Sequence, residues 1–205
     1  MSLLNKLEHI VLASNNQGKL SEFASLFEQY DIKITPQGEL NVTECDEPYH
    51  SFVENSLKKA RHASQQTGLP AIADDSGIVV SALNGLPGVM SARYATLFGE
   101  EKSDANNNAC LIRELQHHDD KSAAYIAVLV FVRHAADPAP LIAQAWWRGE
   151  VQDEAMGEYG FGYDPHFYVP EYGLTAAQMD PDLKNSLSHR AIALKKMIAE
   201  MEAAN

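Results

Sequence analysis

The sequence predicts an α/β fold with a mixed β-sheet that is flanked by helices. Three observations support this prediction. The chain opens with a strand, a helix and a second strand; a short apolar run further along ends in two adjacent aspartates; and two long apolar strands enclose a short turn. The first pattern is typical of parallel strands and the last of an antiparallel hairpin, so a sheet that contains both is mixed.

Length, charge and cysteine content narrow the class of protein. The 205 residues suffice for one large domain or two closely joined lobes. The net charge of -12 argues against non-specific nucleic-acid binding, which relies on basic patches. Cys45 and Cys110 stand far apart, so neither a disulfide framework nor a Cys-rich zinc site is expected. Without an apolar signal region or membrane span, we expect a single cytoplasmic domain over residues 1–205.

A polar loop near the start of the chain is the first candidate for ligand binding. It covers residues 14–19 (Ser-Asn-Asn-Gln-Gly-Lys) and joins a strand predicted at residues 8–14 to a helix predicted at residues 20–30, ahead of a short strand at residues 31–35. Backbone N–H groups and the dipole at a helix N-terminus favour an anion, and Lys19 adds positive charge. An ordinary helix start is the alternative, because the loop matches no Walker motif and no G-x-G-x-x-G.

An acidic loop and a well-delimited helix come next. Residues 37–49 show no clear periodicity and carry the acids Glu39, Glu44, Asp46 and Glu47. Such a loop is usually just solvated, but it could also supply a carboxylate to a metal ion. Residues 51–67 predict a helix, closed by Gly68.

The apolar run at residues 71–73 leads into Asp74, Asp75, Ser76 and Gly77. We predict a buried strand that ends at the aspartates, where open α/β sheets place their ligands, and a further strand at residues 78–83. Because side chains alternate along a strand, the two carboxylates should point in different directions, and one of them can face a metal ion. Gly77 permits a tight turn or a close backbone approach. An Asx turn without a ligand is the alternative.

The middle of the chain supplies a helix at residues 103–117 and the predicted hairpin. Its strands cover residues 123–134 and 141–151, with Trp146 and Trp147 in the second. The tryptophan pair is more typical of a core or a dimer surface than of a stacking platform.

Two motifs follow in the last third of the chain. Residues 157–170 combine closely spaced glycines and aromatic residues, which suits close backbone approach to a planar group; a purely structural turn is the alternative. Residues 181–201 have helical character and contain Lys184 and Ser188-His-Arg190. A break at Ser188 would place His189 and Arg190 at a helix N-terminus, which again favours an anion.

Four separated motifs therefore share a preference for a nucleotide with its metal and phosphates. They are Ser14-x-Asn16-x-x-Lys19, Ala73-Asp-Asp-Ser-Gly77 with Leu83-Asn-Gly-Leu-Pro-Gly88 and Ser91-Ala-Arg-Tyr94 after it, Gly160-Phe-Gly-Tyr-Asp-Pro165, and Lys184 with Ser188-His-Arg190. In this order, over about residues 8 to 200, the chain resembles the inosine triphosphate pyrophosphatase family, also called HAM1-like, and most of all its bacterial dITP/XTP pyrophosphatase branch.

The resemblance implies a Mg²⁺-dependent hydrolase. It would cleave ITP, dITP and XTP to the monophosphate and pyrophosphate, and so remove deaminated purines from the nucleotide pool. The family fold implies an elongated mixed sheet with helices, in two lobes around a nucleotide-binding cleft, and a homodimer. Neither nucleic acid nor a membrane is an expected partner.

The resemblance also assigns roles by position. Asp75 would be the general base and a metal ligand. The family's other metal carboxylate lies in a Glu-Glu-Thr-Gly run that here reads Asp46-Glu-Pro-Tyr49, so Asp46 takes its place, with Glu47 as the alternative. The phosphates would bind Ser14, Asn15, Asn16, Gln17, Gly18 and Lys19, and the substrate would also contact Ser76, Phe161, Gly162, Tyr163, Asp164, Lys184, His189 and Arg190.

These residue types suit the implied chemistry. Water must attack the α-phosphorus while pyrophosphate leaves; a carboxylate can take the proton, Mg²⁺ can offset the developing charge, and cations can hold the triphosphate. Selection against ATP and GTP would need contacts to the 6-oxo group and a penalty for an exocyclic amine. Two rival interpretations are a Maf-like nucleotide pyrophosphatase, whose N-terminal loop typically reads S-x-S-P-R-R, and a catalytically silent nucleotide-binding protein.

Overall fold

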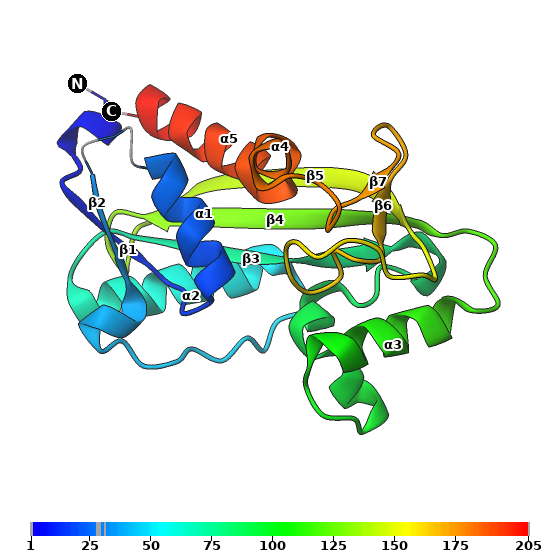
Figure 1. Ribbon diagram of the computed structural model, residues 1–205. Helices are drawn as coiled ribbons and strands as arrows, with labels where there is room; N and C mark the ends of the chain where they lie inside the picture. The colour runs from blue at the N-terminus through cyan, green and yellow to red at the C-terminus, as the bar shows by residue number, and fades with distance from the viewer. Residues whose placement is uncertain (1, 28–29, 31, 205) are drawn as a thin grey trace. The chain divides into compact units, whose positions relative to one another are not determined.

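The computed structural model describes residues 2–27, 30 and 32–204 (Figure 1). Its strands are β1 (His9–Leu12), β2 (Lys33–Pro36), β3 (Ala71–Val80), β4 (Ser122–Val132), β5 (Leu141–Val151), β6 (Phe167–Val169) and β7 (Leu174–Thr175). Its α-helices are α1 (Gln17–Phe27), α2 (Phe52–Thr67), α3 (Asp104–Leu115), α4 (Pro181–Leu187) and α5 (His189–Ala203). None of the helices in the described ranges is long and apolar enough to cross a bilayer.

The strands form one mixed sheet, as the sequence predicts, and their order in it is β2-β1-β3-β4-β5-β6-β7. Strand β1 pairs in parallel with β2 and with β3, whereas β6 pairs antiparallel with β5 and with β7. The neighbours β4 and β5 are joined by only residues 133–140, a connection too short for a parallel crossover, so they form the predicted antiparallel hairpin.

The chain forms two compact units. Unit 1 contains the described residues up to Asp75, residues 127–145 and the segment that starts at Arg190; unit 2 contains residues 76–126 and 146–189. Each unit is therefore assembled from separated parts of the sequence, and the long strands β3, β4 and β5 contribute to both.

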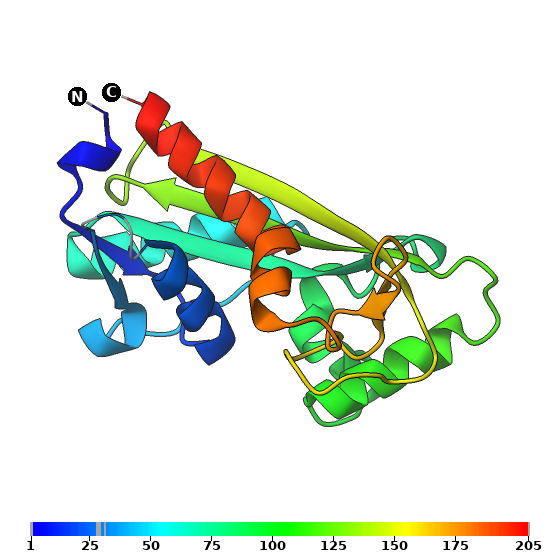
Figure 2. The same ribbon diagram turned by 45° about the horizontal axis from the view of Figure 1, so that its top comes forward.

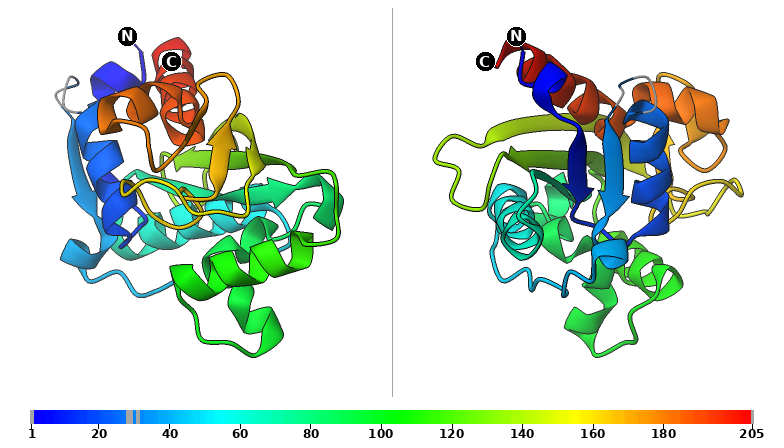
Figure 3. Two further views of the ribbon diagram at one scale, coloured as in Figure 1. Left: turned by 45° about the vertical axis from the view of Figure 1, so that its right-hand side comes forward. Right: turned by 90° about the vertical axis from the view of Figure 1, so that its left-hand side faces the viewer.

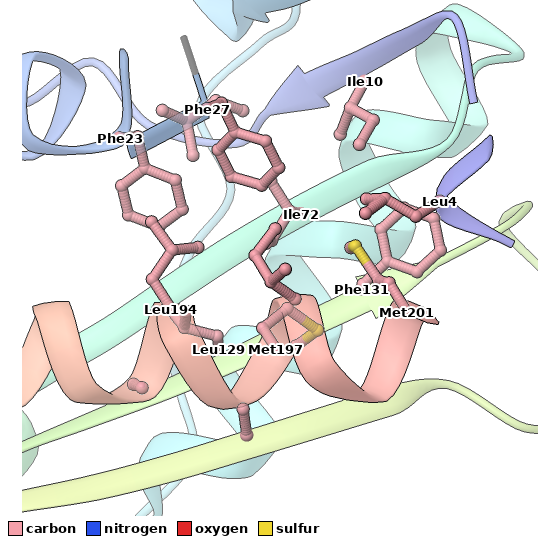
Figure 4. Close-up of a cluster of buried hydrophobic side chains, with 14 of the residues drawn as sticks. Leu4, Ile10, Phe23, Phe27, Ile72, Leu129, Phe131, Leu194, Met197 and Met201 are labelled. Carbon is pink, nitrogen blue, oxygen red and sulfur yellow. The ribbon is translucent and has the colours of Figure 1, made fainter. Parts of the chain in front are cut away.

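Unit 1 has a core formed where α1 and α5 pack on the sheet (Figure 4). Phe23 and Phe27 from α1 meet Ile72 of β3 and Met197 of α5, and all four side chains are buried. Helix α2 covers the opposite face of this part of the sheet, as Figures 2 and 3 show. Its N-cap is Ser51, whose hydroxyl accepts a hydrogen bond from Glu54 N, so the predicted helix at residues 51–67 is confirmed.

Unit 2 has its own core, built around the second half of β3 and helix α3. Ile78 and Val80 of β3 belong to the same buried cluster as Tyr94, Leu111 of α3 and Phe167 of β6. Helix α3 begins after the N-cap Ser103, whose hydroxyl accepts a hydrogen bond from Asn106 N. The predicted helix at residues 103–117 is thus confirmed, although it ends two residues earlier.

Strand β3 does not end at the aspartates as the sequence predicts; it continues through Asp74 and Asp75 to Val80. Burial of two carboxylates in a strand is possible because each of them has a cationic partner, described below. Gly77 permits a close approach within the sheet, since a Cβ there would lie 2.4 Å from Ser91 Oγ and 2.6 Å from the carbonyl oxygen of Gly88. The strand predicted at residues 78–83 is therefore the end of β3 as far as Val80, and only its last three residues differ, because Ser81–Leu83 form a 3₁₀ turn.

Two further boundaries differ from the prediction. Helix α1 begins at Gln17 rather than residue 20, because Asn16 Oδ1 accepts a hydrogen bond from Lys19 N and caps the helix earlier. The predicted end of this helix at residue 30 and the start of the next strand at residue 31 involve residues 28, 29 and 31, which lie outside the described part of the chain. At the C-terminus the predicted break is confirmed: α4 ends at Leu187 and α5 begins at His189.

Candidate active site

The two aspartates of β3 lie at the centre of a charged cluster in unit 1. Asp74 is 1% exposed and Asp75 6% exposed. As alternation along a strand requires, they have different partners. Asp74 Oδ2 lies 2.9 Å from Lys19 Nζ and 3.1 Å from Arg190 Nε, whereas Asp75 Oδ1 accepts a hydrogen bond from Lys59 Nζ at 3.2 Å.

Asp74 joins the first turn of α1 to the first turn of α5. Burial on its own would raise the pKa of Asp74, but Lys19 and Arg190 outweigh this effect and hold the pKa well below its ordinary value. Burial lowers the pKa of Lys19 despite the attraction of Asp74. The ionised Asp74 thus fixes two cations at two helix N-termini, where backbone N–H groups also favour an anion.

Lys59 of α2 connects the acidic loop to the aspartates of β3. Its Nζ lies 2.7 Å from Glu47 Oε1 and 3.2 Å from Asp75 Oδ1, and it donates a hydrogen bond of 2.9 Å to the carbonyl oxygen of Asp74. Burial would lower the pKa of Lys59, but the carboxylates of Asp75 and Glu47 together raise it above its ordinary value. Lys59 is therefore a permanent cation that holds two carboxylates within reach of a single point.

Asp75 keeps one oxygen available. Within the described residues, Asp75 Oδ2 is buried and has no hydrogen-bond partner. Burial raises the pKa of Asp75 above its ordinary value, although the Lys59 ammonium acts in the opposite direction. A buried carboxylate oxygen of this kind is costly unless a ligand or a proton satisfies it, and a raised pKa suits a group that accepts a proton.

The acidic loop delivers Glu47, rather than Asp46, to this cluster. Asp46 forms an ion pair with Lys58 on the outer side of α2, and its side chain is 80% exposed, against 26% for Glu47. Glu47 instead shares Lys59 with Asp75. Of the two carboxylates that the sequence offers as a second metal ligand, only Glu47 shares a cation with Asp75 here.

Asn55 holds the acidic loop in place. It is fully buried in α2; its Oδ1 accepts a hydrogen bond from Tyr49 N, and its Nδ2 donates one to the carbonyl oxygen of Tyr49. The next residue, Ser56, donates through Oγ to the carbonyl oxygen of Ala73 and ties the helix to β3. The buried polar side of α2 therefore positions Glu47, Lys59 and Asp75 relative to one another.

The residues 14–19 predicted to hold phosphates lie after β1, which ends at Leu12, and run through a short loop into the first turn of α1. Ser14 is buried, and its hydroxyl accepts a hydrogen bond from Asn16 N. Asn16 caps α1, and Lys19 reaches from that turn to Asp74. Gln17 and Gly18 open the helix, and their backbone N–H groups, like those of any helix start, have no partner within the helix itself.

A second cluster lies in unit 2 around the buried Asp164. Its Oδ2 accepts hydrogen bonds from Lys184 Nζ at 2.6 Å and from Phe161 N at 2.9 Å, and its Oδ1 accepts one from Tyr125 Oη at 3.1 Å. Lys184 also lies over the ring of Phe161, 5.5 Å from its centroid, in a cation–π arrangement. Three of the predicted substrate-binding residues therefore meet here.

His189 belongs to a stack of rings in the same unit. Its imidazole is parallel to the Tyr125 ring, with an interplanar angle of 9° and centroids 4.8 Å apart, and Trp147 stacks more distantly on both. Trp147 is 7% exposed and Trp146 44% exposed, so one tryptophan is in the core and the other on the surface.

The loop at residues 160–164 is held from several sides. Gly160 has φ +79°, and a Cβ there would lie 2.1 Å from Asp164 Oδ2, which explains the glycine. Helix α3 binds both backbone groups of Gly162: Asp104 Oδ2 accepts from Gly162 N, and Asn108 Nδ2 donates to Gly162 O, both at 2.8 Å. Tyr163 is buried and donates to the carbonyl oxygen of Ser91, so its role in this structure is to anchor the loop.

The predicted site residues thus form two groups. Unit 1 contains residues 14–19, Asp75 and Arg190, and unit 2 contains Ser76, residues 161–164, Lys184 and His189. Sequence reasoning missed Lys59 and Tyr125. The sequence could have indicated Lys59, because it lies on the same side of its helix as the polar Asn55 and Ser56. Tyr125 lies in an apolar strand, where the sequence predicts only a core residue.

Chemically, the unit 1 cluster combines cations and helix N-termini for phosphates with two carboxylates that suit a hard divalent cation. Mg²⁺ is bound in proteins through one or two carboxylates together with substrate phosphates, and Glu47 and Asp75 supply that number. Within the described residues no group of three or more His, Cys, Asp and Glu side chains comes together, so a site of only protein ligands is not formed there.

Comparison with known proteins identifies close relatives. A family model described as the Ham1 family matches residues 10–200. A dITP/XTP pyrophosphatase of Burkholderia pseudomallei is 61% identical over 192 residues, which are 94% of this chain and 92% of that protein. A dITP/XTP pyrophosphatase of Chromobacterium violaceum is 56% identical over 196 residues, which are 96% of this chain and 98% of that protein.

Solved structures with the same fold are also found. A HAM1 protein from Coxiella burnetii superposes with a TM-score of 0.90 at 44% identity, covering 97% of this chain and all of that one. A nucleoside-triphosphatase, or dITP/XTP pyrophosphatase, from Mycobacterium abscessus superposes with a TM-score of 0.73 at 34% identity, covering 93% of this chain and 98% of that one.

Proposed function

We propose the reaction of this protein from the premise that the chain belongs to the Ham1 family. It is a dITP/XTP pyrophosphatase: it hydrolyses dITP, XTP and ITP to the nucleoside monophosphate and pyrophosphate. The support is the family match over residues 10–200 together with relatives of that name at 56–61% identity over nearly the whole chain. This activity removes deaminated purines from the nucleotide pool.

The observation that carries the catalytic proposal is the arrangement of Glu47, Lys59 and Asp75. Glu47 and Asp75 share one ammonium, and Asp75 Oδ2 is buried without a hydrogen-bond partner among the described residues. These two carboxylates would hold Mg²⁺, with Glu47, the alternative in the sequence, in the role that the resemblance assigned to Asp46. When bound, Mg²⁺ supplies positive charge that offsets the charge of the triphosphate and of the leaving pyrophosphate.

In the proposed mechanism, the side chains of unit 1 handle the phosphates and the proton. The N-terminal turn of α1 would present backbone N–H groups to phosphate oxygens, and Lys19 and Arg190 would add positive charge. A water molecule attacks the α-phosphorus, and Asp75 accepts its proton as the bond to pyrophosphate breaks. The raised pKa of Asp75 makes this carboxylate a stronger proton acceptor than an exposed aspartate.

The side chains of unit 2 would recognise the base. Phe161 offers an aromatic face, and Lys184 and His189 offer hydrogen-bond donors for a 6-oxo group. A 6-amino purine presents a donor in place of that acceptor and leaves the donors of the site unpaired, which disfavours ATP.

We also propose that the protein acts as a homodimer in the cytoplasm, where its substrates are formed. Large apolar side chains of unit 2, among them Leu97, Trp146 and Tyr159, are about half exposed, as expected of a surface that a second subunit covers. Light scattering after size exclusion should give twice the mass of one chain. The mass of a single chain at micromolar concentration would contradict this proposal.

The deciding experiment measures pyrophosphate release from ITP, XTP, dITP, ATP and GTP, with Mg²⁺ and with EDTA. We expect release that needs Mg²⁺ and favours ITP, dITP and XTP over ATP and GTP by at least about a hundredfold. Release that prefers ordinary nucleotides would overturn the base preference. Binding without release from any of them would identify a silent nucleotide-binding protein instead.

A further inference from the structure

Tyr125 connects the two parts of the unit 2 cluster. It lies on β4 and is nearly buried. Its hydroxyl donates to Asp164 Oδ1, and its ring stacks on His189. Through Asp164 the same hydroxyl is linked to Lys184, while the ring also contacts Phe167 in a tilted arrangement, with the centroids 4.5 Å apart.

The hydroxyl of Tyr125 helps to fix the orientation of the Asp164 carboxylate. Asp164 accepts three hydrogen bonds, two at Oδ2 and the one from Tyr125 at Oδ1, so its carboxylate has a fixed rotation. A hydrogen bond to a charged group is about twice as strong as one between neutral groups. Since Lys184 is bound to the other oxygen of the same carboxylate, a rotation of Asp164 would displace the Lys184 ammonium.

The ring of Tyr125 helps to fix the plane of the His189 imidazole. A nearly parallel stack fixes the plane of the imidazole, and therefore the directions in which its two nitrogens can donate or accept. His189 is the first residue of α5 and is 6% exposed, so its imidazole is buried together with the ring on which it stacks. Tyr125 thus controls one base-facing residue through its hydroxyl and another through its ring.

We infer that Tyr125 is a positioning residue that sets the preference of the enzyme for 6-oxo purines over 6-amino purines, because it fixes Lys184 and His189 at the same time. This inference rests on the proposed function and extends it. Selectivity between bases that differ in one hydrogen-bonding group depends on donors and acceptors being held in place, since a donor that can swing away accepts the wrong base at a smaller penalty.

The test compares Tyr125→Phe, which removes only the hydroxyl, with Tyr125→Leu, which also removes the stack. For Tyr125→Phe we expect the KM for ITP to rise roughly tenfold, with kcat within about threefold of the wild type, and the preference for ITP over ATP to fall by a similar factor. For Tyr125→Leu we expect the KM for ITP to rise, and the nucleotide preference to fall, by about a hundredfold each. Because Tyr125→Phe keeps the ring and Tyr125→Leu does not, the difference between the two variants measures the effect of the ring separately from that of the hydroxyl.

Tyr94→Phe is the matched control. Tyr94 is a buried tyrosine of the same unit, and its ring packs edge-on against Phe98. This variant loses a hydroxyl of the same kind and should keep the KM and the preference for ITP within about twofold. Thermal unfolding of every variant shows the fraction that is folded. A lower melting temperature of Tyr125→Phe with an unchanged KM and an unchanged ITP preference would mean a purely structural role and would overturn the inference.

Calorimetric titration of ITP in EDTA, with the same variants, keeps this test separate from that of the proposed function. If the wild type binds ITP but does not cleave it, the proposed reaction fails, and a weaker affinity of Tyr125→Phe still supports the positioning role. If the wild type cleaves ITP selectively and Tyr125→Phe does so equally well, the proposed reaction stands and the inference about Tyr125 fails. If the wild type neither binds nor cleaves ITP, both are wrong.

Discussion

Adjacent acids in the loop before α2 have opposite environments, and single substitutions can separate their roles. Glu47 shares Lys59 with Asp75, whereas Asp46 pairs with Lys58 at the surface. We expect Glu47→Gln to raise the Mg²⁺ concentration needed for half-maximal activity at least tenfold, because it removes a charged oxygen ligand. Asp46→Asn is the matched control and should change it less than twofold. A Mg²⁺ titration of both variants in the pyrophosphate assay gives the answer, and the reverse order would return the ligand role to Asp46.

Asp75 is expected to act on turnover and not on nucleotide affinity. Asp75→Asn keeps the size of the side chain but cannot accept the proton of the attacking water. We predict that kcat falls by a factor of about 100 to 10,000, while nucleotide binding in EDTA stays within about threefold. Single-turnover kinetics and calorimetry measure the two quantities separately. Near-normal kcat in this variant would refute the general-base role.

At the scale of elements, helix α3 holds the loop that carries Phe161. Asp104 and Asn108 bind the N–H and the carbonyl oxygen of Gly162. Asn108→Ala, alone or with Asp104→Ala, frees this loop, so we expect the KM for ITP to rise about three- to tenfold with little change in kcat. Asn106→Ala on the same helix, whose side chain donates to the carbonyl oxygen of Glu101, serves as the control. Equal KM values for the three proteins would show that the loop needs no support from α3.

The turn between β4 and β5 depends on the charge of Asp137. This buried carboxylate accepts hydrogen bonds from Arg133 N, from Arg133 Nε and from Ala139 N. These donors, led by the Arg133 guanidinium, keep the pKa of Asp137 well below its ordinary value. The ionised form therefore stabilises the folded state at pH values above the ordinary pKa of about 3.9, and this stabilisation is lost as the pH falls below it.

Asp137→Asn should accordingly lower the free energy of unfolding by about 2 kcal/mol at pH 7. The difference from the wild type should shrink as the pH is lowered from 5 towards 2, which urea denaturation at a series of pH values can follow. Asp153→Asn, which removes a carboxylate that is 65% exposed and paired with Lys121, should have little effect at any pH. A difference for Asp137→Asn that does not depend on pH would show that shape, not charge, matters at this position.

Local signals predicted the elements well where they do not depend on distant partners. Ser51 and Gly68 delimit α2, and Ser188 separates α4 from α5, because caps and left-handed glycines act on the residues beside them. The continuation of β3 through Asp74 was not predictable in this way. Its burial depends on Lys19, 55 residues away, and on Arg190, 116 residues away, and the local sequence contains neither.

The candidate site was predictable to the same extent. The motifs identify its residues, but the sequence cannot decide between Asp46 and Glu47, because neighbouring residues on a loop reach different partners according to how the loop is held. Here the fully buried Asn55 holds it, through the backbone of Tyr49. Tyr125 was missed for a related reason. A tyrosine in an apolar strand is predicted to be a core side chain, and only the structure shows that its hydroxyl donates to Asp164.

At the scale of the whole molecule, the order of the segments along the chain determines the order in which each unit can be completed. The core of unit 1 includes Leu194, Met197 and Met201 of α5, although most of this unit is made from the first 75 residues. Unit 2 contains no residue beyond His189. During synthesis from the N-terminus, the first strands and helices therefore leave the ribosome long before the helix that covers them.

The unit that contains the N-terminal segment is thus the last to close. Until α5 has emerged, the apolar side chains of α1 and β3 that pack against it stay uncovered, and this exposed apolar surface makes the nascent chain prone to aggregation.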